Sequence, residues 1–217
     1  MKLFGYAVAF ALLGANIFRA LAEATLVGQV ALPDPQTPPA NTSRYQNKTP
    51  GQVAPPNPSV AVVYLEGNFP TRVSNSSIPA RVIQEHFQFS PPVLPVRVGT
   101  AIEFPNLDDS YHNVFSYSKA KRFDLGRYRK DEKPAAVMFD KTGVVKLYCE
   151  IHEHMRGTIL VLDTPHFTRT DTNGNFRLEH LPAGKFTLKA WLNEKSELER
   201  AVDLADGATM RVEFTGK

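Results

Sequence analysis

Residues 81–162 are divided into many short runs of strand-forming residues, and this division constrains the fold more than any other feature of the sequence. Valine, isoleucine, leucine and phenylalanine fill the runs, while Pro, Gly, Asn, Asp and Ser separate them. About seven or eight such runs within roughly 85 residues are typical of a β-sandwich or β-barrel. We therefore predict an all-β protein, with a Greek-key sandwich or barrel here and a second, smaller β-sandwich elsewhere in the chain.

Three local patterns in this stretch make specific predictions. Residues 81–89 have the composition of one continuous strand. The sequence Asp140-Lys141-Thr142-Gly143 is typical of a hairpin turn and predicts that its flanking strands, 137–139 and 144–149, pair with each other. The charged segment 119–133 predicts a loop or a single turn.

The remaining strand-like runs lie on both sides of this block. Residues 25–32 and 59–67 have strand composition and flank a proline-rich spacer. Residues 164–217 contain several more strand-like runs. Residues 196–204, by contrast, have a helix-forming composition. Because this tail is smaller than most domains that bury a core alone, it needs a partner. We therefore predict three parts: residues 25–75 with the amino-terminal strands and the proline-rich loop, a domain at 78–163, and a second sandwich at 164–217 completed by 25–67.

The amino terminus has the three parts of a secretory signal peptide. Lys2 is followed by an apolar run at 3–13 and then by small residues, with cleavage predicted after Ala22 or, alternatively, after Ala24. The apolar run is short for a bilayer span, although a permanent amino-terminal anchor is the alternative. We expect a periplasmic or secreted protein without a permanent membrane span once residues 1–22 are removed.

Charge and cysteine content exclude several classes of protein. Lys and Arg number 25 against 22 Asp and Glu, and the basic residues form no long run, so we expect no nucleic-acid partner. The single cysteine excludes an intramolecular disulfide. An unpaired thiol in an oxidising compartment requires burial, bonding or a chemical use.

The cysteine belongs to the motif Cys149-x2-His152-x2-Met155, which lies between two predicted strands. A thiolate, an imidazole and a thioether suit copper, which favours two His and one Cys near a plane with a weak Met on the axis. A second imidazole has to come from another strand, and His112, between two strand-like runs, is the best candidate. The alternative for Cys149 is a buried small hydrophobic residue without a metal.

These residues resemble the copper-binding segments of the cupredoxins, the plastocyanin-like blue copper proteins, and the short ligand loop is most similar to that of amicyanin. The resemblance implies one type 1 copper ion held by His112, Cys149, His152 and Met155. It also implies that Asn113 ties the two ligand segments together beside the sulfur. The chain as a whole resembles periplasmic proteins described as methylamine-utilisation-like.

The tail resembles the carboxypeptidase-regulatory or transthyretin-like β-sandwich, through the turn motif Asp171-x2-Gly174 and the sequence Leu181-Pro182-x-Gly184. That fold is usually a binding or spacer module. The resemblance implies that the copper domain, at about residues 80–163, is inserted into this second sandwich.

Together these features predict a periplasmic blue copper protein that carries single electrons between redox partner proteins of unknown identity. An enzyme is the weaker class, because a catalytic copper would need a second His-rich set, which the remaining histidines do not form: His86, His154, His166 and His180. Two alternatives stay open, a periplasmic copper carrier or sensor and a β-sandwich binding module with a vestigial copper site.

Overall fold

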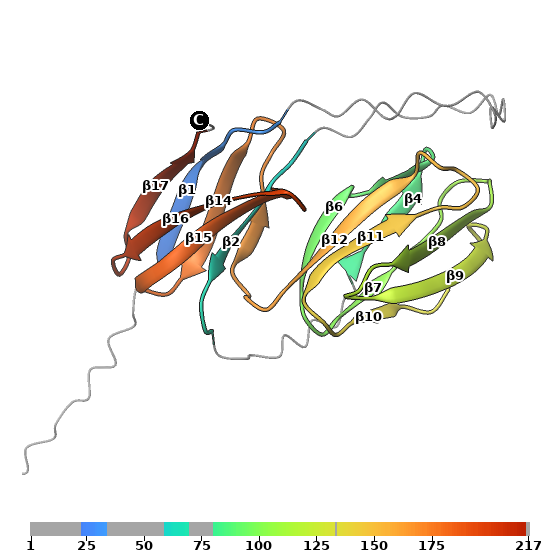
Figure 1. Ribbon diagram of the computed structural model, residues 1–217, viewed down its shortest axis with the longest axis horizontal. Coiled ribbons are helices and arrows are strands. Elements are labelled where there is room, and N and C mark those ends of the chain that lie inside the picture. Colours follow the sequence, from blue (N-terminus) through green and yellow to red (C-terminus); the bar gives the residue numbers. More distant parts are fainter. Residues whose placement is uncertain (1–22, 34–58, 70–79, 133, 216–217) are drawn as a thin grey trace, which may run out of the picture.

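The computed structural model describes residues 23–33, 59–69, 80–132 and 134–215 (Figure 1). These residues form strands, turns and loops and contain no helix, which confirms the all-β prediction. Accordingly, the described ranges contain no helix long and apolar enough to cross a membrane. The predicted signal peptide and most of the proline-rich loop, residues 34–58, lie outside the described residues.

The first sandwich consists of a five-stranded sheet that packs against shorter strands. The order of the large sheet is β6 (Val93–Arg97), β12 (Arg156–Leu162), β11 (Gly143–Tyr148), β8 (His112–Tyr117) and β9 (Arg122–Tyr128). Facing it are β10 (Val137–Phe139), β7 (Thr100–Glu103) and β3 (Ala80–Arg81), together with the hairpin of β4 (Ile83–Glu85) and β5 (Gln88–Ser90). Side chains from both layers form one apolar core, which includes Phe89, Ile102, Phe139, Leu147 and Ile159.

The predicted continuous strand at residues 81–89 is wrong, because the chain turns back on itself inside it. β4 and β5 pair in antiparallel register, with Glu85 opposite Gln88. His86 and Phe87 form the turn, with φ angles of 53° and 59°. A two-residue turn with positive φ at both positions matches the twist of a β-hairpin. The composition of the segment favours strands but does not reveal this turn.

Two further local predictions are also wrong. The sequence at 140–143 does turn, but β10 pairs with β7 while β11 pairs with β12 and β8, so the chain crosses between sheets instead of forming a hairpin. Part of the charged segment at 119–133 is strand β9, which pairs with β8. Phe123 and Leu125 of β9 pack against the core, while the alternating residues Arg122, Asp124 and Gly126 are exposed. This alternation with a period of two favours a strand despite the charges.

The second sandwich is built from both ends of the chain. One sheet has the order β14 (Asn175–Leu181), β1 (Ala24–Val30) and β17 (Thr209–Phe214). The other has the order β13 (Phe167–Arg169), β2 (Val62–Glu66), β15 (Gly184–Asn193) and β16 (Ser196–Leu204). The helix-forming segment 196–204 is therefore a strand, because it pairs with β15 along its whole length. The amino-terminal strands β1 and β2 have neighbours on both sides, so each sheet depends on one of them.

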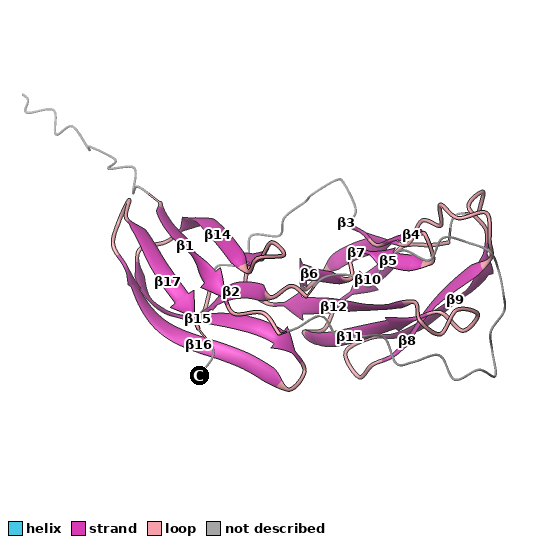
Figure 2. Cartoon of the chain, turned by 90° about the horizontal axis from the view of Figure 1, so that it is seen from above, coloured by secondary structure: helices cyan, strands magenta, loops and turns pink. Residues whose placement is uncertain are grey.

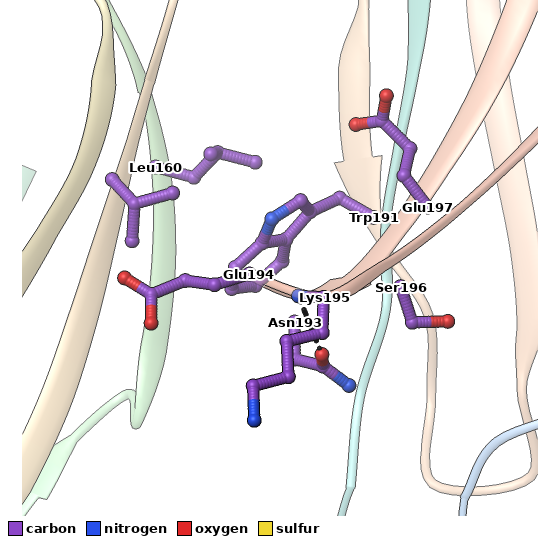
Figure 3. A pocket seen from close by; sticks show the side chains of 8 residues that line it. Leu160, Trp191, Asn193, Glu194, Lys195, Ser196 and Glu197 are labelled. Carbon is purple, nitrogen blue, oxygen red and sulfur yellow. Dashed lines mark hydrogen bonds between the residues drawn. The ribbon is translucent and has the colours of Figure 1, made fainter.

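The two sandwiches pack against each other through β12 (Figures 1 and 2). Ile159 and Val161 lie in the core of the first sandwich, while Leu160 and Leu162 on the opposite face contact Trp191 of the second. Every residue of β12 from Gly157 onward is buried, since both faces of the strand are covered. Leu160 and Trp191 also line an open pocket of about 490 Å³. Figure 3 shows the side chains that line it.

We expect that a fragment of residues 164–217 does not fold alone. Without β1, strands β14 and β17 lose their shared neighbour, and without β2, strands β13 and β15 lose theirs. Circular dichroism and amide chemical-shift dispersion of the isolated fragment should be those of an unfolded chain, whereas the whole protein unfolds cooperatively. A fragment with a cooperative thermal transition would contradict the domain division, which is a proposal until this measurement is made.

Candidate metal centre

Three side chains from distant segments meet at one end of the first sandwich. His112 is the first residue of β8, Cys149 directly follows β11, and His152 lies in the loop that leads to β12. One ligand atom from each of these residues lies within 4.8 Å of the other two. His112 Nδ1 is 3.0 Å from His152 Nδ1, and Cys149 Sγ is 3.8 Å from that same nitrogen. Within the described residues, no other three His, Cys, Asp or Glu side chains form such a group.

The site is buried on the side of the core and partly open on the side of the loop. His112 is 0% exposed and Cys149 4%, whereas His152 is half-buried. Met155 is also buried and belongs to the same apolar core as Cys149. Its backbone N–H donates to the carbonyl oxygen of His152 at 2.9 Å, which closes the loop into a turn. His152 is therefore the member of the group with a route to solvent.

Asn113 joins the two segments that carry the group. Its side-chain oxygen accepts a hydrogen bond from the backbone N–H of Glu150 at 2.9 Å, and its side-chain nitrogen donates to Asp124 at 2.9 Å. The side chain is buried, so water competes little for these bonds. These hydrogen bonds fix β8 to the loop beside Cys149.

The surroundings of Cys149 favour the thiolate. Burial raises the pKa of the thiol, but its interactions with the His112 and His152 rings and hydrogen bonds from the backbone N–H groups of Asn113 and His152 lower it more, to about 5. The thiolate is the form that binds metals. Cys149 is therefore deprotonated at neutral pH before any metal arrives.

Asp108 holds the other side of the His112 ring. His112 Nε2 lies 2.8 Å from Asp108 Oδ2. Burial raises the pKa of Asp108, but hydrogen bonds from the backbone of Phe87 and from the His112 ring lower it more, so the carboxylate is ionised. Since a carboxylate only accepts, His112 Nε2 carries the proton. In the neutral form of the ring, the lone pair of Nδ1 then faces Cys149 and His152.

Phe87 covers the two imidazoles. Its ring makes edge contacts with His112 and His152, with centroid distances of 5.6 and 4.9 Å. Sequence reasoning missed this residue because it treated 81–89 as one strand. It also missed Asp108, although the separation of four residues from His112 was a signal available in the sequence.

His154 does not join the group. Its side chain is exposed, and its ring centroid lies 6.1 Å from that of His152. Of the four predicted ligands, the structure thus brings the donor atoms of His112, Cys149 and His152 together. Met155 is buried in the adjoining core.

The donor set fits copper. Two imidazole nitrogens and one thiolate are the equatorial ligands that this metal takes in trigonal sites with a weak axial thioether. The neutral His112 ring with its proton on Nε2 directs the lone pair of Nδ1 into the group, and the lowered pKa of Cys149 favours the thiolate. The fold and the site together define a class: an all-β protein of two sandwiches with a buried His2Cys group.

No protein-family model and no curated protein sequence matches this chain. Among solved structures, the chain is similar to a Cu-containing nitrite reductase (NirK) from Thermus scotoductus SA-01, with 28% identity over 40% of this chain and 23% of that one and a TM-score of 0.38. It is also similar to a purple cupredoxin from Nitrosopumilus maritimus, with 25% identity over 38% of this chain and 99% of that one and a TM-score of 0.34. A point mutant of amicyanin in its Cu(I) form has 19% identity over 46% of this chain and 98% of that one, with a TM-score of 0.36.

The chain thus spans less than a quarter of the nitrite reductase, and each match covers less than half of this chain. Matches that cover so little of the chain do not assign it to a family.

Proposed function

We propose that this chain is a periplasmic or secreted type 1 copper protein that carries single electrons between redox partner proteins. His112, Cys149 and His152 would hold one copper ion, with Met155 as a weak axial ligand. The observation that carries this proposal is the convergence of two imidazole nitrogens and one thiolate within 4.8 Å at a buried position.

Bound copper would supply the one-electron chemistry, and the chain would supply a rigid frame. Asp108 holds the His112 ring, Asn113 fixes β8 to the ligand loop, and Phe87 covers both imidazoles. A centre whose ligands cannot move apart changes little in geometry when its charge changes. Fast electron transfer needs such a centre, whereas a carrier that must release copper needs ligands that can separate.

His152 is the proposed exit for the electron, because it is the half-buried member of the group while His112 and Cys149 are enclosed. The second sandwich, which resembles the carboxypeptidase-regulatory or transthyretin-like module, would serve as a spacer or as a surface for a partner.

The proposal predicts a colour. Titration of the metal-free protein with Cu(II) should give an intense thiolate-to-copper absorption band in the visible, saturating at one copper per chain. The Zn²⁺-loaded protein is the control and should be colourless. A Cu(II)-loaded protein without this band would contradict the proposal.

Retention of the metal separates electron transfer from copper delivery. Repeated reduction and reoxidation in the presence of a copper chelator should leave the copper bound to an electron carrier. Loss of copper to the chelator in the reduced state would favour the alternative, a copper carrier or sensor.

A further inference from the structure

The carboxylate of Asp108 lies between the proposed copper centre and the hairpin that covers it. One oxygen accepts the backbone N–H of His86 at 2.8 Å. The other accepts the backbone N–H of Phe87 at 3.0 Å and the Nε2–H of His112 at 2.8 Å. The side chain is only 13% exposed. A single carboxylate therefore satisfies both backbone donors of the turn and the ring of one candidate ligand.

The loop that carries Asp108 is itself fixed. The backbone N–H of Asp108 donates to the side-chain oxygen of Asn106 at 2.9 Å. Asn106 is 1% exposed, and its side-chain nitrogen donates to the carbonyl oxygens of Ser110 and Tyr128. Tyr128 lies opposite His112 in the pairing of β8 with β9. Asp108 is thus held by the same pair of strands that positions His112.

The turn that Asp108 binds is strained. His86 and Phe87 both have positive φ, a conformation that costs a bulky residue free energy and persists where surrounding contacts impose it. The two hydrogen bonds to Asp108 are such contacts. They place the Phe87 ring against the edges of His112 and His152.

We propose that Asp108 is a positioning residue of the copper centre. It fixes His112 as the Nε2–H tautomer with Nδ1 directed at the metal position, and it holds Phe87 as the cover of the two imidazoles. Its negative charge, which acts on the metal position through the hydrogen bond and the imidazole ring, favours Cu(II) over Cu(I). This inference rests on the proposed function for its copper readouts, but its statement about the tautomer applies to the metal-free protein.

The neighbouring residue provides a matched control. Asp109 carries the same charge one position along, but its side chain is 87% exposed and pairs with Lys130 at the surface. Asp108→Asn and Asp109→Asn change the net charge equally. Any difference between them therefore comes from the position of the carboxylate and not from overall charge.

The first test uses the metal-free protein. The ring ¹⁵N shifts of His112 should show the Nε2–H tautomer in the wild type and in Asp109→Asn. In Asp108→Asn this preference should weaken, because the neutral amide has one accepting oxygen and cannot accept from His86 N–H, Phe87 N–H and His112 Nε2–H together as the two carboxylate oxygens do. An Nδ1–H tautomer in the wild-type protein would overturn the proposal without any variant, so the test holds even if Asp108→Asn does not fold.

The second test uses copper. Loss of a partner that orients a metal-binding His weakens metal affinity by about 10- to 100-fold. Competition with chelators should show this loss for Cu(II) in Asp108→Asn, a smaller loss for Cu(I), and near wild-type values for Asp109→Asn. Each tenfold excess of the Cu(II) loss over the Cu(I) loss raises the reduction potential by about 59 mV.

The outcomes separate the two proposals. If the wild type binds copper with the visible band and Asp108→Asn matches Asp109→Asn in tautomer, affinity and potential, the role of Asp108 is refuted while the copper function stands. If the wild type binds no copper, the copper function fails, and the tautomer comparison still decides whether Asp108 positions His112.

Discussion

Replacement of Cys149 by serine is expected to abolish the visible absorption of the Cu(II)-loaded protein. The band requires a thiolate on the metal, and a serine hydroxyl is neither ionised at neutral pH nor a soft ligand. Because the chain contains one cysteine, no other thiol can replace it. The measurement is the absorption spectrum of wild type and variant at one equivalent of Cu(II), with an expected loss of the whole band.

The control for this variant is His154→Gln. His154 lies two residues beyond His152 but is exposed and outside the group of converging donors. Its replacement should leave the band and the copper stoichiometry unchanged. If Cys149→Ser kept the band, or if His154→Gln abolished it, the assignment of the ligands would be wrong.

Replacement of Gly28 by alanine is expected to have the largest effect on stability. Gly28 lies in the middle of β1, next to β17, and an added Cβ would come 1.7 Å from the backbone oxygen of Val212 and 2.9 Å from the ring of Phe176. A backbone carbonyl in a paired strand cannot move aside without breaking the pairing. Since overpacking costs about 1–3 kcal/mol and occasionally more, we expect a loss at or above the upper end of that range, measured by urea unfolding.

Gly126→Ala is the matched control. Gly126 has a φ of 69°, and an added Cβ there would meet no atom within 4 Å. Its replacement carries only the conformational cost of alanine in the left-handed region, about 1–2 kcal/mol. A Gly28→Ala variant as stable as Gly126→Ala would mean that β1 does not pack against β17 in solution, and that the amino-terminal strand does not complete the second sandwich.

The candidate site could be predicted where its residues lie close together in the sequence. Cys149, His152 and Met155 are linked by sequence spacing, and the need for a second imidazole from another strand pointed to His112, which the structure places beside Cys149. Their role as metal ligands stays a prediction. Asp108 and Phe87 were not predicted, because their function arises from a hairpin whose turn brings them to His112 and not from any pattern along the chain.

The errors in the fold have a common physical origin. The sequence at 140–143 indicates that the chain turns, but which sheet the next strand joins depends on partners far away along the chain. Residues 196–204 have helix-forming composition, yet pairing with β15 and burial of Val202 and Leu204 outweigh that weak preference. By contrast, the prediction that the tail needs additional strands rests on its size, which the length of the chain gives directly.

The covering of both faces of β12 has a practical consequence for the preparation of the copper-binding half as an isolated domain. Excision of the second sandwich would turn Leu160 and Leu162 from interior residues into an apolar patch next to Val93 and Val144. Exposed patches of this kind promote aggregation. A soluble truncated protein would therefore need polar substitutions at positions 160 and 162, while Ile159 and Val161, whose side chains point the other way, would have to stay as they are.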